Sequence, residues 1–291
     1  MDLTRLSTIS ALSDSVTIEQ LDDVKIVRVR HSKAEAAISL HGGHVLSFKP
    51  TQGEELIWMS KDAIFHPDKA IRGGVPVCWP WFGRIENPAH GFARNSQWTL
   101  IEHKENENGV MISLGLSASE ETKAIWAFEF EARLNITIGD ELTITLDAKN
   151  TDNKPWNCSG ALHTYLNISD IHTSDITGMG DRYIDGLLNG TTCTGGHELK
   201  INEAVDRVYT ESESTLAISD NLRTITVTNE GNNAAVIWNP WAEGAESMGD
   251  MNNDGYLTMV CIESTYHATS LETAKTIQPN ESFTLSTIIR A

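Results

Sequence analysis

Apolar and polar residues alternate along the segment from Trp126 to Ile138. The even positions carry apolar side chains, from Trp126 through Leu134 to Ile138, whereas most of the odd positions are polar or charged. This period of two predicts a β-strand with one face on a core. A turn of Gly139-Asp140-Glu141 follows, and the same alternation resumes at Leu142. The two segments therefore predict a long antiparallel hairpin.

Other stretches have similar strand-like patterns, and glycine- and asparagine-rich turns separate them. Helical patterning is scarce, with the first twenty residues and Ser117–Ile125 as the candidates for short helices. No low-complexity linker or internal repeat divides the chain. The sequence predicts an all-β protein, one β-sandwich domain of mainly antiparallel strands over residues 1–291, with residues 1–20 as a candidate N-terminal extension. The further predicted strands are 24–30, 36–48, 109–116, 224–227, 256–264 and 283–289.

The charge balance narrows the range of partners. The chain has 291 residues, with 40 acidic and 22 basic side chains and a formal net charge of −18. A general nucleic-acid binder or an anionic-membrane binder needs a broad positive surface, so we expect neither partner. No window approaches the roughly 18 apolar residues of a membrane helix, and the N-terminus lacks the pattern of a signal peptide. The four cysteines form no CxxC pair, which is typical of free thiols. We expect a cytoplasmic monomer.

One segment departs from the acidic character of the chain. Residues 69–94 contain Lys69, Arg72, Arg84 and Arg94 against Glu86 alone, a net charge of +3. The segment also carries prolines, a pair of glycines and three aromatic residues. Aromatic faces suit sugar rings, and guanidinium groups match phosphate or carboxylate oxygens. The alternative is a proline-rich loop whose arginines pair with surface acids, and composition alone does not separate the two interpretations.

Two ionisable residues lie within apolar, strand-like runs. His163 follows Gly160-Ala161-Leu162, and Glu263 follows Val260-Cys261-Ile262. Burial disfavours the charged form, so the pKa of such a glutamate rises and that of such a histidine falls. Both pKa values then move in directions that suit general acid–base catalysis. A hydrogen-bonded core histidine and an ion-paired glutamate are the alternative interpretations.

Two further motifs invite a metal interpretation. His41-Gly42-Gly43-His44 offers two histidines, but no third ligand lies nearby in the sequence. The run from Asp250 to Gly255 resembles a calcium loop but lacks the glutamate at its twelfth position, where Cys261 stands. We interpret both motifs as turns and expect neither a metal nor a cofactor.

Taken together, these segments resemble the hexose-6-phosphate mutarotases (glucose-6-phosphate 1-epimerases) of the aldose 1-epimerase superfamily. The likeness covers roughly residues 25–290, and the motifs occur in the order of the family. The matching stretches are Ala70-Ile71-Arg72-Gly73-Gly74-Val75-Pro76, His90-Gly91-Phe92-Ala93-Arg94-Asn95, Ala161-Leu162-His163-Thr164-Tyr165-Leu166, Asp206-Arg207-Val208-Tyr209, Trp238-Asn239-Pro240-Trp241, Met248-Gly249-Asp250-Met251 and Cys261-Ile262-Glu263.

The resemblance implies a galactose-mutarotase-like β-supersandwich with few short helices. It also implies interconversion of the α and β anomers of a hexose 6-phosphate, with glucose 6-phosphate expected and a small sugar phosphate as the only partner. By position, His163 and Glu263 match the catalytic residues of the family. Some relatives have a glutamine where this chain has Ala89, which leaves the selectivity for sugar hydroxyls open. The matching substrate-binding residues are Arg72, Arg94, His90 and Asp206.

The implied reaction opens the sugar ring, rotates the freed aldehyde and closes the ring on the other face. We hypothesise that Glu263 removes the O1 proton while a charged His163 protonates the ring oxygen O5. Two other functions stay open at this point. One is an epimerase of unphosphorylated aldoses, and the other is a non-catalytic sugar-binding module.

Overall fold

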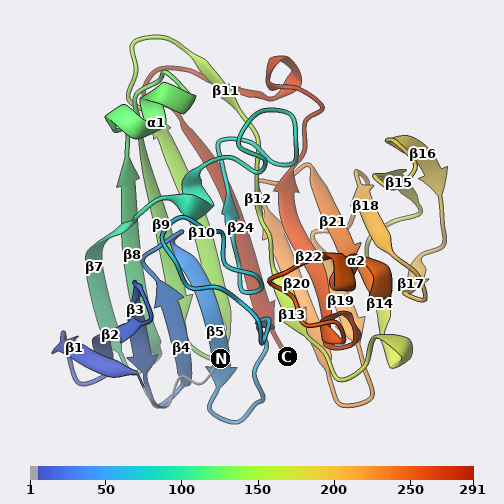
Figure 1. Ribbon diagram of the computed structural model, residues 1–291, viewed down its shortest axis with the longest axis horizontal. Helices are drawn as coiled ribbons and strands as arrows, with labels where there is room; N and C mark the ends of the chain where they lie inside the picture. The colour runs from blue at the N-terminus through green and yellow to red at the C-terminus, as the bar shows by residue number, and fades with distance from the viewer. Residues whose placement is uncertain (1–5) are drawn as a thin grey trace.

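The computed structural model describes residues 6–291, which form β-sheets with short helices between them (Figure 1). Every pair of neighbouring strands in these sheets is antiparallel. The predicted mainly antiparallel all-β fold is therefore confirmed.

The N-terminal strands form a five-stranded sheet in chain order. Figure 1 shows these blue strands beside the green strands of a larger sheet. The strands are β1 (Ser7–Ala11), β2 (Val16–Leu21), β3 (Val24–Arg30), β4 (Ala34–Ser39) and β5 (His44–Pro50).

A nine-stranded sheet joins the middle and the end of the chain. Its order is β17-β14-β19-β20-β24-β10-β9-β8-β7. The strands are β7 (Thr99–Asn106), β8 (Gly109–Ser117), β9 (Phe130–Ile138), β10 (Leu142–Asn150), β14 (Asp175–Thr177), β17 (Glu198–Lys200), β19 (Thr215–Ser219), β20 (Thr224–Glu230) and β24 (Ser282–Arg290).

An eight-stranded sheet carries most of the candidate site. Its order is β16-β15-β18-β21-β22-β12-β6, and β13 also pairs with β22. A separate pair is formed by β11 (Trp156–Cys158) and β23 (Lys275–Ile277). The strands of the eight-stranded sheet are β6 (Val77–Cys78), β12 (Gly160–Leu162), β13 (Tyr165–Asn167), β15 (Arg182–Asp185), β16 (Thr191–Thr194), β18 (Val205–Tyr209), β21 (Ala234–Asn239) and β22 (Met259–Tyr266).

The described helices are short and lie in the connections. The α-helices are α1 (Glu120–Ile125) and α2 (Trp241–Ser247), and the 3₁₀ turns are η2 (Ala93–Asn95), η3 (Ile171–Thr173), η4 (Gly255–Thr258) and η5 (Leu271–Thr273). The helix expected near Ser117–Ile125 is α1. Its first turn is held by a capping box between Ser119 and Thr122. None of the helices that the structure describes has the length and apolar character needed to cross a lipid bilayer.

The hairpin of β9 and β10 has the predicted register, with Ile138 opposite Leu142 across the turn. The apolar residues of β9, such as Leu134, are buried, and its outward residues, such as Arg133 and Thr137, are exposed. These apolar side chains belong to a core cluster that runs from Val16 in β2 to Ile289 in β24. The period of two along the sequence therefore marks the face that packs against the interior.

The first twenty residues differ from the prediction of a short helix. Residues 7–11 and 16–21 are the strands β1 and β2, and β2 pairs with β3 from Val16↔Val29 to Leu21↔Val24. The neighbouring strand supplies backbone hydrogen-bond partners that a short helix would need from within its own few turns. Residues 1–5 of this segment lie outside the described residues.

Candidate active site

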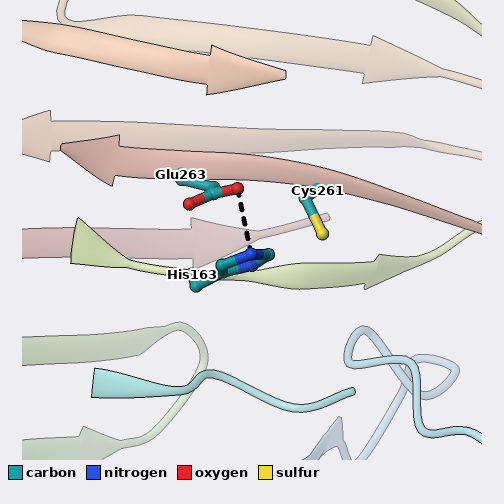
Figure 2. A group of neighbouring side chains, drawn as sticks. All are labelled: His163, Cys261 and Glu263. Atoms are coloured by element: carbon teal, nitrogen blue, oxygen red, sulfur yellow. Dashed lines mark ion pairs between the residues drawn. The ribbon is translucent and has the colours of Figure 1, made fainter. Parts of the chain in front are cut away.

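His163 and Glu263 face each other at the centre of the eight-stranded sheet (Figure 2). Glu263 lies on β22, and His163 lies in the short connection between β12 and β13, both of which pair with β22. A ring nitrogen of His163 (Nε2) is 3.4 Å from Oε1 of Glu263, with side chains 12% and 1% exposed respectively. This distance is longer than an ordinary N–H···O hydrogen bond of roughly 2.7–3.2 Å, so the pair is close without being tightly bonded. The structure brings the two predicted catalytic residues together.

Burial and neighbouring charges set the protonation of this pair. Burial, assisted by His90, Arg94 and Arg72, lowers the pKa of His163 well below its ordinary value. Burial and the charge of Asp206 raise the pKa of Glu263 well above its ordinary value. Both shifts favour the uncharged forms, a neutral imidazole and a protonated carboxyl group. These directions oppose the hypothesis of a charged His163 in the ground state of the free protein, because burial above all, and then the neighbouring His90 and arginines, disfavour that charge.

Arg72 lies beside the pair and is held at two of its nitrogens. Its Nε donates to Oδ1 of Asp250 at 3.1 Å, and its Nη1 donates to the hydroxyl of Tyr165 at 3.1 Å. The Tyr165 ring stacks on the His163 ring. The guanidinium thus has a fixed orientation and keeps Nη2 and one N–H of Nη1 for another partner.

The backbone around Arg72 is held by the His41-Gly42-Gly43-His44 turn. Nε2 of His41 lies 2.8 Å from the carbonyl oxygen of Lys69, and Nε2 of His44 lies 2.7 Å from that of Gly73. A carbonyl oxygen only accepts, so both rings carry their proton on Nε2. The expected turn is confirmed, and the two histidines bind backbone on either side of Arg72.

Glycine is required next to Arg72 because the packing leaves no room for a side chain. Gly73 and Gly74 have positive φ angles of 101° and 70°. A Cβ on Gly74 would lie 2.3 Å from Nε2 of His44, and one on Gly73 would lie 2.6 Å from the carbonyl oxygen of Trp58. The two glycines of the positively charged segment 69–94 therefore allow the chain to pack closely around Arg72.

Arg94 and His90 come from the other end of the positive segment. Arg94 donates from Nη2 to the carbonyl oxygen of Ala89 at 2.9 Å, and its Nε is buried without a hydrogen-bond partner. The His90 ring lies 6.0 Å from the His163 ring between centroids. Burial, with Arg94, Arg84 and Arg72, lowers the pKa of His90 to about 3, so this ring is neutral at physiological pH.

Asp206 reaches the same face from β18. It pairs with Trp238 of β21, and Trp238 pairs in turn with Cys261 of β22. The pKa of Asp206 is raised by burial and by Asp185. A Cβ on Gly186 would lie 2.6 Å from Oδ2 of Asp206, so the turn after β15 passes directly over this carboxyl group. The structure thus places Asp206 on the face of the sheet that carries Cys261 and Glu263.

The aromatic residues of the segment 69–94 lie either in the core or at the edge of the site. Trp79 and Trp81 are fully buried in the core, so neither ring is available to stack on a sugar. Phe82 is only half-buried and lies 5.2 Å from the His90 ring. Trp238, which we did not single out as an aromatic contact, is also half-buried and lies 6.1 Å from the His163 ring. The exposed aromatic edges of the site therefore come from Phe82 and Trp238.

Two residues that hold the site were not assigned roles from the sequence. Tyr165 and Asp250 both bind Arg72, although each occurs within a stretch that resembles the family. The position of Tyr165 two residues after His163 was the available signal, because a strand places such residues on one face. Asp250 was assigned to a turn, and no local pattern connects it with a residue 178 positions away.

Two cavities of the protein are formed by residues other than the predicted site residues. One of about 1030 Å³ is lined by residues such as Lys33, Asp140 and Arg223, and another of about 630 Å³ lies beside α1. None of the six predicted site residues lines either cavity. The site is defined by its converging polar groups rather than by its volume.

One group in the part of the chain that the structure describes has the composition of a metal site. A potential ligand atom from each of His163, Cys261 and Glu263 lies within 4.8 Å of the others. Figure 2 shows the Cys261 sulfur beside the His163 ring. All four cysteines are free thiols.

Comparison with known proteins identifies the family of this chain. The aldose 1-epimerase family matches residues 25–290. A candidate glucose-6-phosphate 1-epimerase of Salmonella typhimurium is 38% identical over 282 residues, which is 94% of each chain. One from Escherichia coli is 37% identical and covers 93% of this chain and 92% of its own length.

Solved structures agree with this relationship. The crystal structure of a candidate mutarotase from Salmonella typhimurium has a TM-score of 0.92 and 35% identity, with 98% of this chain and 96% of that chain covered. A galactose 1-epimerase from Lactobacillus acidophilus has a TM-score of 0.73 at 13% identity, covers 98% and 97% of the two chains, and shares the fold. The predicted galactose-mutarotase-like fold is confirmed. The chain belongs to the aldose 1-epimerase family.

Proposed function

We propose that this protein is an isomerase that interconverts the α and β anomers of a hexose 6-phosphate, with glucose 6-phosphate as the first substrate to test. The observation that carries the proposal is the His163–Glu263 pair, 3.4 Å apart on the sheet with arginine side chains around it. The relatives in Salmonella typhimurium and Escherichia coli are described as candidate glucose-6-phosphate 1-epimerases, which supports the same substrate.

In the proposed reaction, Glu263 and His163 exchange protons with the two oxygens on C1. Glu263 takes the proton of the O1 hydroxyl as the C1–O5 bond breaks, and His163 gives a proton to O5. The freed aldehyde rotates about C1–C2, and the same groups act in reverse as the ring closes on the other face. The reaction needs no covalent intermediate.

The negative charge of the substrate phosphate changes the protonation of His163 and Glu263 in this proposal. Arg94 and Arg72 contribute to the low pKa of His163 in the free protein. A phosphate dianion bound to their guanidinium groups neutralises this effect and raises the pKa of His163. This favours transfer of the proton from the carboxyl group of Glu263 to the imidazole, and the two groups titrate as a unit. An anionic substrate therefore favours the base and the acid forms that ring opening requires.

The arginines favour a phosphorylated sugar over the two rival functions. Arg72 keeps N–H groups free, and the Nε of Arg94 is buried without a partner. A free aldose offers no anion to satisfy such groups, and a non-catalytic binding module has no need of a buried acid–base pair. Asp206, with Phe82 and Trp238 at the edge, provides contacts to the sugar hydroxyls and ring.

Anomer exchange measured by NMR tests the proposal directly. Saturation transfer between the anomeric protons of glucose 6-phosphate, galactose 6-phosphate and free glucose separates the three functions. We expect enzyme-dependent exchange that is much faster for a hexose 6-phosphate than for glucose. Equal acceleration of all three sugars would favour the free-aldose epimerase, and binding without acceleration would favour the module.

We further propose that the protein acts in the cytoplasm as a monomer and as a single domain, without nucleic acid or membrane as a partner. The net charge of −18 and the free thiols support this setting. The core cluster that runs through the large sheets supports one domain. Size-exclusion chromatography with light scattering measures the oligomeric state.

A further inference from the structure

The Cys261 thiol lies beside the proposed catalytic pair, and the proposed reaction does not use it. Cys261 precedes Glu263 by two residues on β22, so both side chains project from the same face of the strand. Tyr165, whose ring stacks on His163, is the β13 residue paired with Cys261. Figure 2 shows sulfur, imidazole and carboxylate converging on one place.

The spacing of these groups matches that of ligands on a tetrahedral zinc ion. Nitrogen and oxygen ligands bind zinc at roughly 2.0–2.1 Å, which places two of them about 3.3–3.4 Å from each other. Nε2 of His163 and Oε1 of Glu263 are 3.4 Å apart. A thiolate at roughly 2.3 Å from zinc lies about 3.5 Å from the other ligands. The three ligand atoms are within 4.8 Å of one another, so closing a separation to about 3.5 Å takes a shift of up to about 1.3 Å.

The charge of the assembled site also suits a dication. Unpaired charge is costly at a buried position, and both Glu263 and Cys261 are almost fully buried. One thiolate, one carboxylate and a neutral imidazole bring two negative charges to the ion, so the complex has no net charge. Oε2 of Glu263 is buried and has no hydrogen-bond partner, and an ion bound at this carboxylate offers it one.

We propose that His163, Cys261 and Glu263 form a binding site for a thiophilic divalent cation such as Zn²⁺, and that the ion inhibits the enzyme. The cation binds the thiolate, the carboxylate and one ring nitrogen, and the thiol and carboxyl protons pass to solvent as it binds. The fourth coordination position stays open for water, as in zinc sites with three protein ligands. Inhibition follows because the lone pairs that exchange protons with the sugar are then bound to metal.

The inhibition rests on the proposed function, whereas the binding does not. Cobalt(II) is therefore the first probe, because a thiolate bound to it gives a charge-transfer absorption in the near ultraviolet. The chelator-treated full-length protein is titrated with Co²⁺, and Zn²⁺ is then added to displace it. The variant Cys261→Ser removes the thiolate at nearly constant volume, and Cys193→Ala is the matched control on β16, remote in sequence and outside the ligand group.

We expect one equivalent of Co²⁺ with the thiolate band in the wild type and in Cys193→Ala, and loss of the band in Cys261→Ser. His163→Asn, which leaves the cysteine in place, weakens Co²⁺ binding at least tenfold. Absence of the band in folded wild-type protein, or its persistence in folded Cys261→Ser, overturns the site. If Cys261→Ser does not fold, the His163→Asn result decides: unchanged Co²⁺ affinity refutes the assignment.

A second measurement concerns inhibition. Zn²⁺ is expected to slow anomer exchange of glucose 6-phosphate in the wild type and in Cys193→Ala, with at least a tenfold higher concentration needed in Cys261→Ser. Mg²⁺, which prefers oxygen ligands, is expected to have no effect. Metal binding without any anomer exchange in the metal-free protein would refute the proposed function and leave the binding site standing. Exchange that is insensitive to bound Zn²⁺ would refute the inhibition alone.

Discussion

The ring of Tyr165 stacks on the ring of His163, with centroids 4.9 Å apart and planes inclined by 11°. The same tyrosine accepts a hydrogen bond from Arg72 through its hydroxyl. Tyr165 is buried, and burial keeps its phenol protonated by raising its pKa. One side chain thus fixes both the orientation of the proposed acid and the position of a proposed phosphate ligand.

Two substitutions of Tyr165 are expected to separate these contributions. Tyr165→Phe keeps the stacked ring but removes the acceptor for Arg72, so the KM for glucose 6-phosphate rises about tenfold while kcat stays within a few-fold of wild type. Tyr165→Leu removes the stacked ring as well and lowers kcat. Steady-state kinetics by anomer exchange provides both values. A Tyr165→Phe variant that lost kcat with an unchanged KM would contradict the positioning of Arg72.

The proposed acid and base are expected to be indispensable for exchange. Glu263→Gln and His163→Asn keep the approximate shape of each side chain but remove its proton transfer. Each is expected to lower the enzyme-dependent rate by about 10²–10⁴-fold, after subtraction of the spontaneous rate. Circular dichroism confirms that each variant is folded. A folded variant with the wild-type rate would refute the role of that residue.

Arg72 and Arg94 are expected to act mainly on the phosphate. Replacing either with glutamine removes a charged hydrogen-bond donor, worth roughly 1.5–3 kcal/mol, and raises KM for glucose 6-phosphate about ten- to a hundredfold. Any slow exchange of free glucose is expected to change much less. Arg182→Gln is the matched control, because Arg182 is an exposed arginine that pairs with Glu211. Equal losses for glucose and glucose 6-phosphate would argue against a phosphate clamp.

Glu263 is expected to cost stability at neutral pH. Its pKa is raised in the folded protein, so the folded state keeps a proton that the unfolded chain releases above the ordinary carboxyl pKa of 4.5. Stability therefore falls as pH rises from about that value toward the folded pKa, by about 1.4 kcal/mol per pH unit. Glu263→Gln has no proton to lose, so its Tm is expected to exceed that of wild type at pH 7.

The pH dependence provides the check on that expectation. The difference in Tm between Glu263→Gln and wild type is expected to shrink as pH is lowered toward 4.5. Thermal melts across this range measure it. A difference that is the same at every pH would show that folding does not raise the pKa of Glu263.

Strand positions were predictable where burial follows a local period. The pattern from Trp126 onward located β9, although the strand itself begins at Phe130, because the pattern records burial and not ladder pairing. The N-terminal segment was not predictable in this way. Its strand β1 pairs with β2, and β2 pairs in turn with β3. β1 is exposed along its length, so it carries no apolar period.

The candidate site was partly predictable for a similar reason. His163 and Glu263 are ionisable residues in apolar runs, which is visible locally. The pairing of Arg72 with Asp250 depends on the course of the chain between them. Whether Trp79 and Trp81 are buried or exposed depends on which face of the loop packs against the core. The proline-rich segment has no periodic pattern that indicates this face.

The His41 and His44 contacts have a consequence for how substrate preference can change. Both rings bind main-chain carbonyl groups, of Lys69 and Gly73. These hydrogen bonds hold the backbone of the loop in place and do not depend on which side chains the loop carries. The path of this loop is thus anchored by a turn elsewhere in the protein. If Arg72 binds the substrate phosphate as proposed, substitutions at the exposed positions of this loop can change the preferred anion while the course of the loop is preserved. The specificity of the protein can then change without a change in its fold.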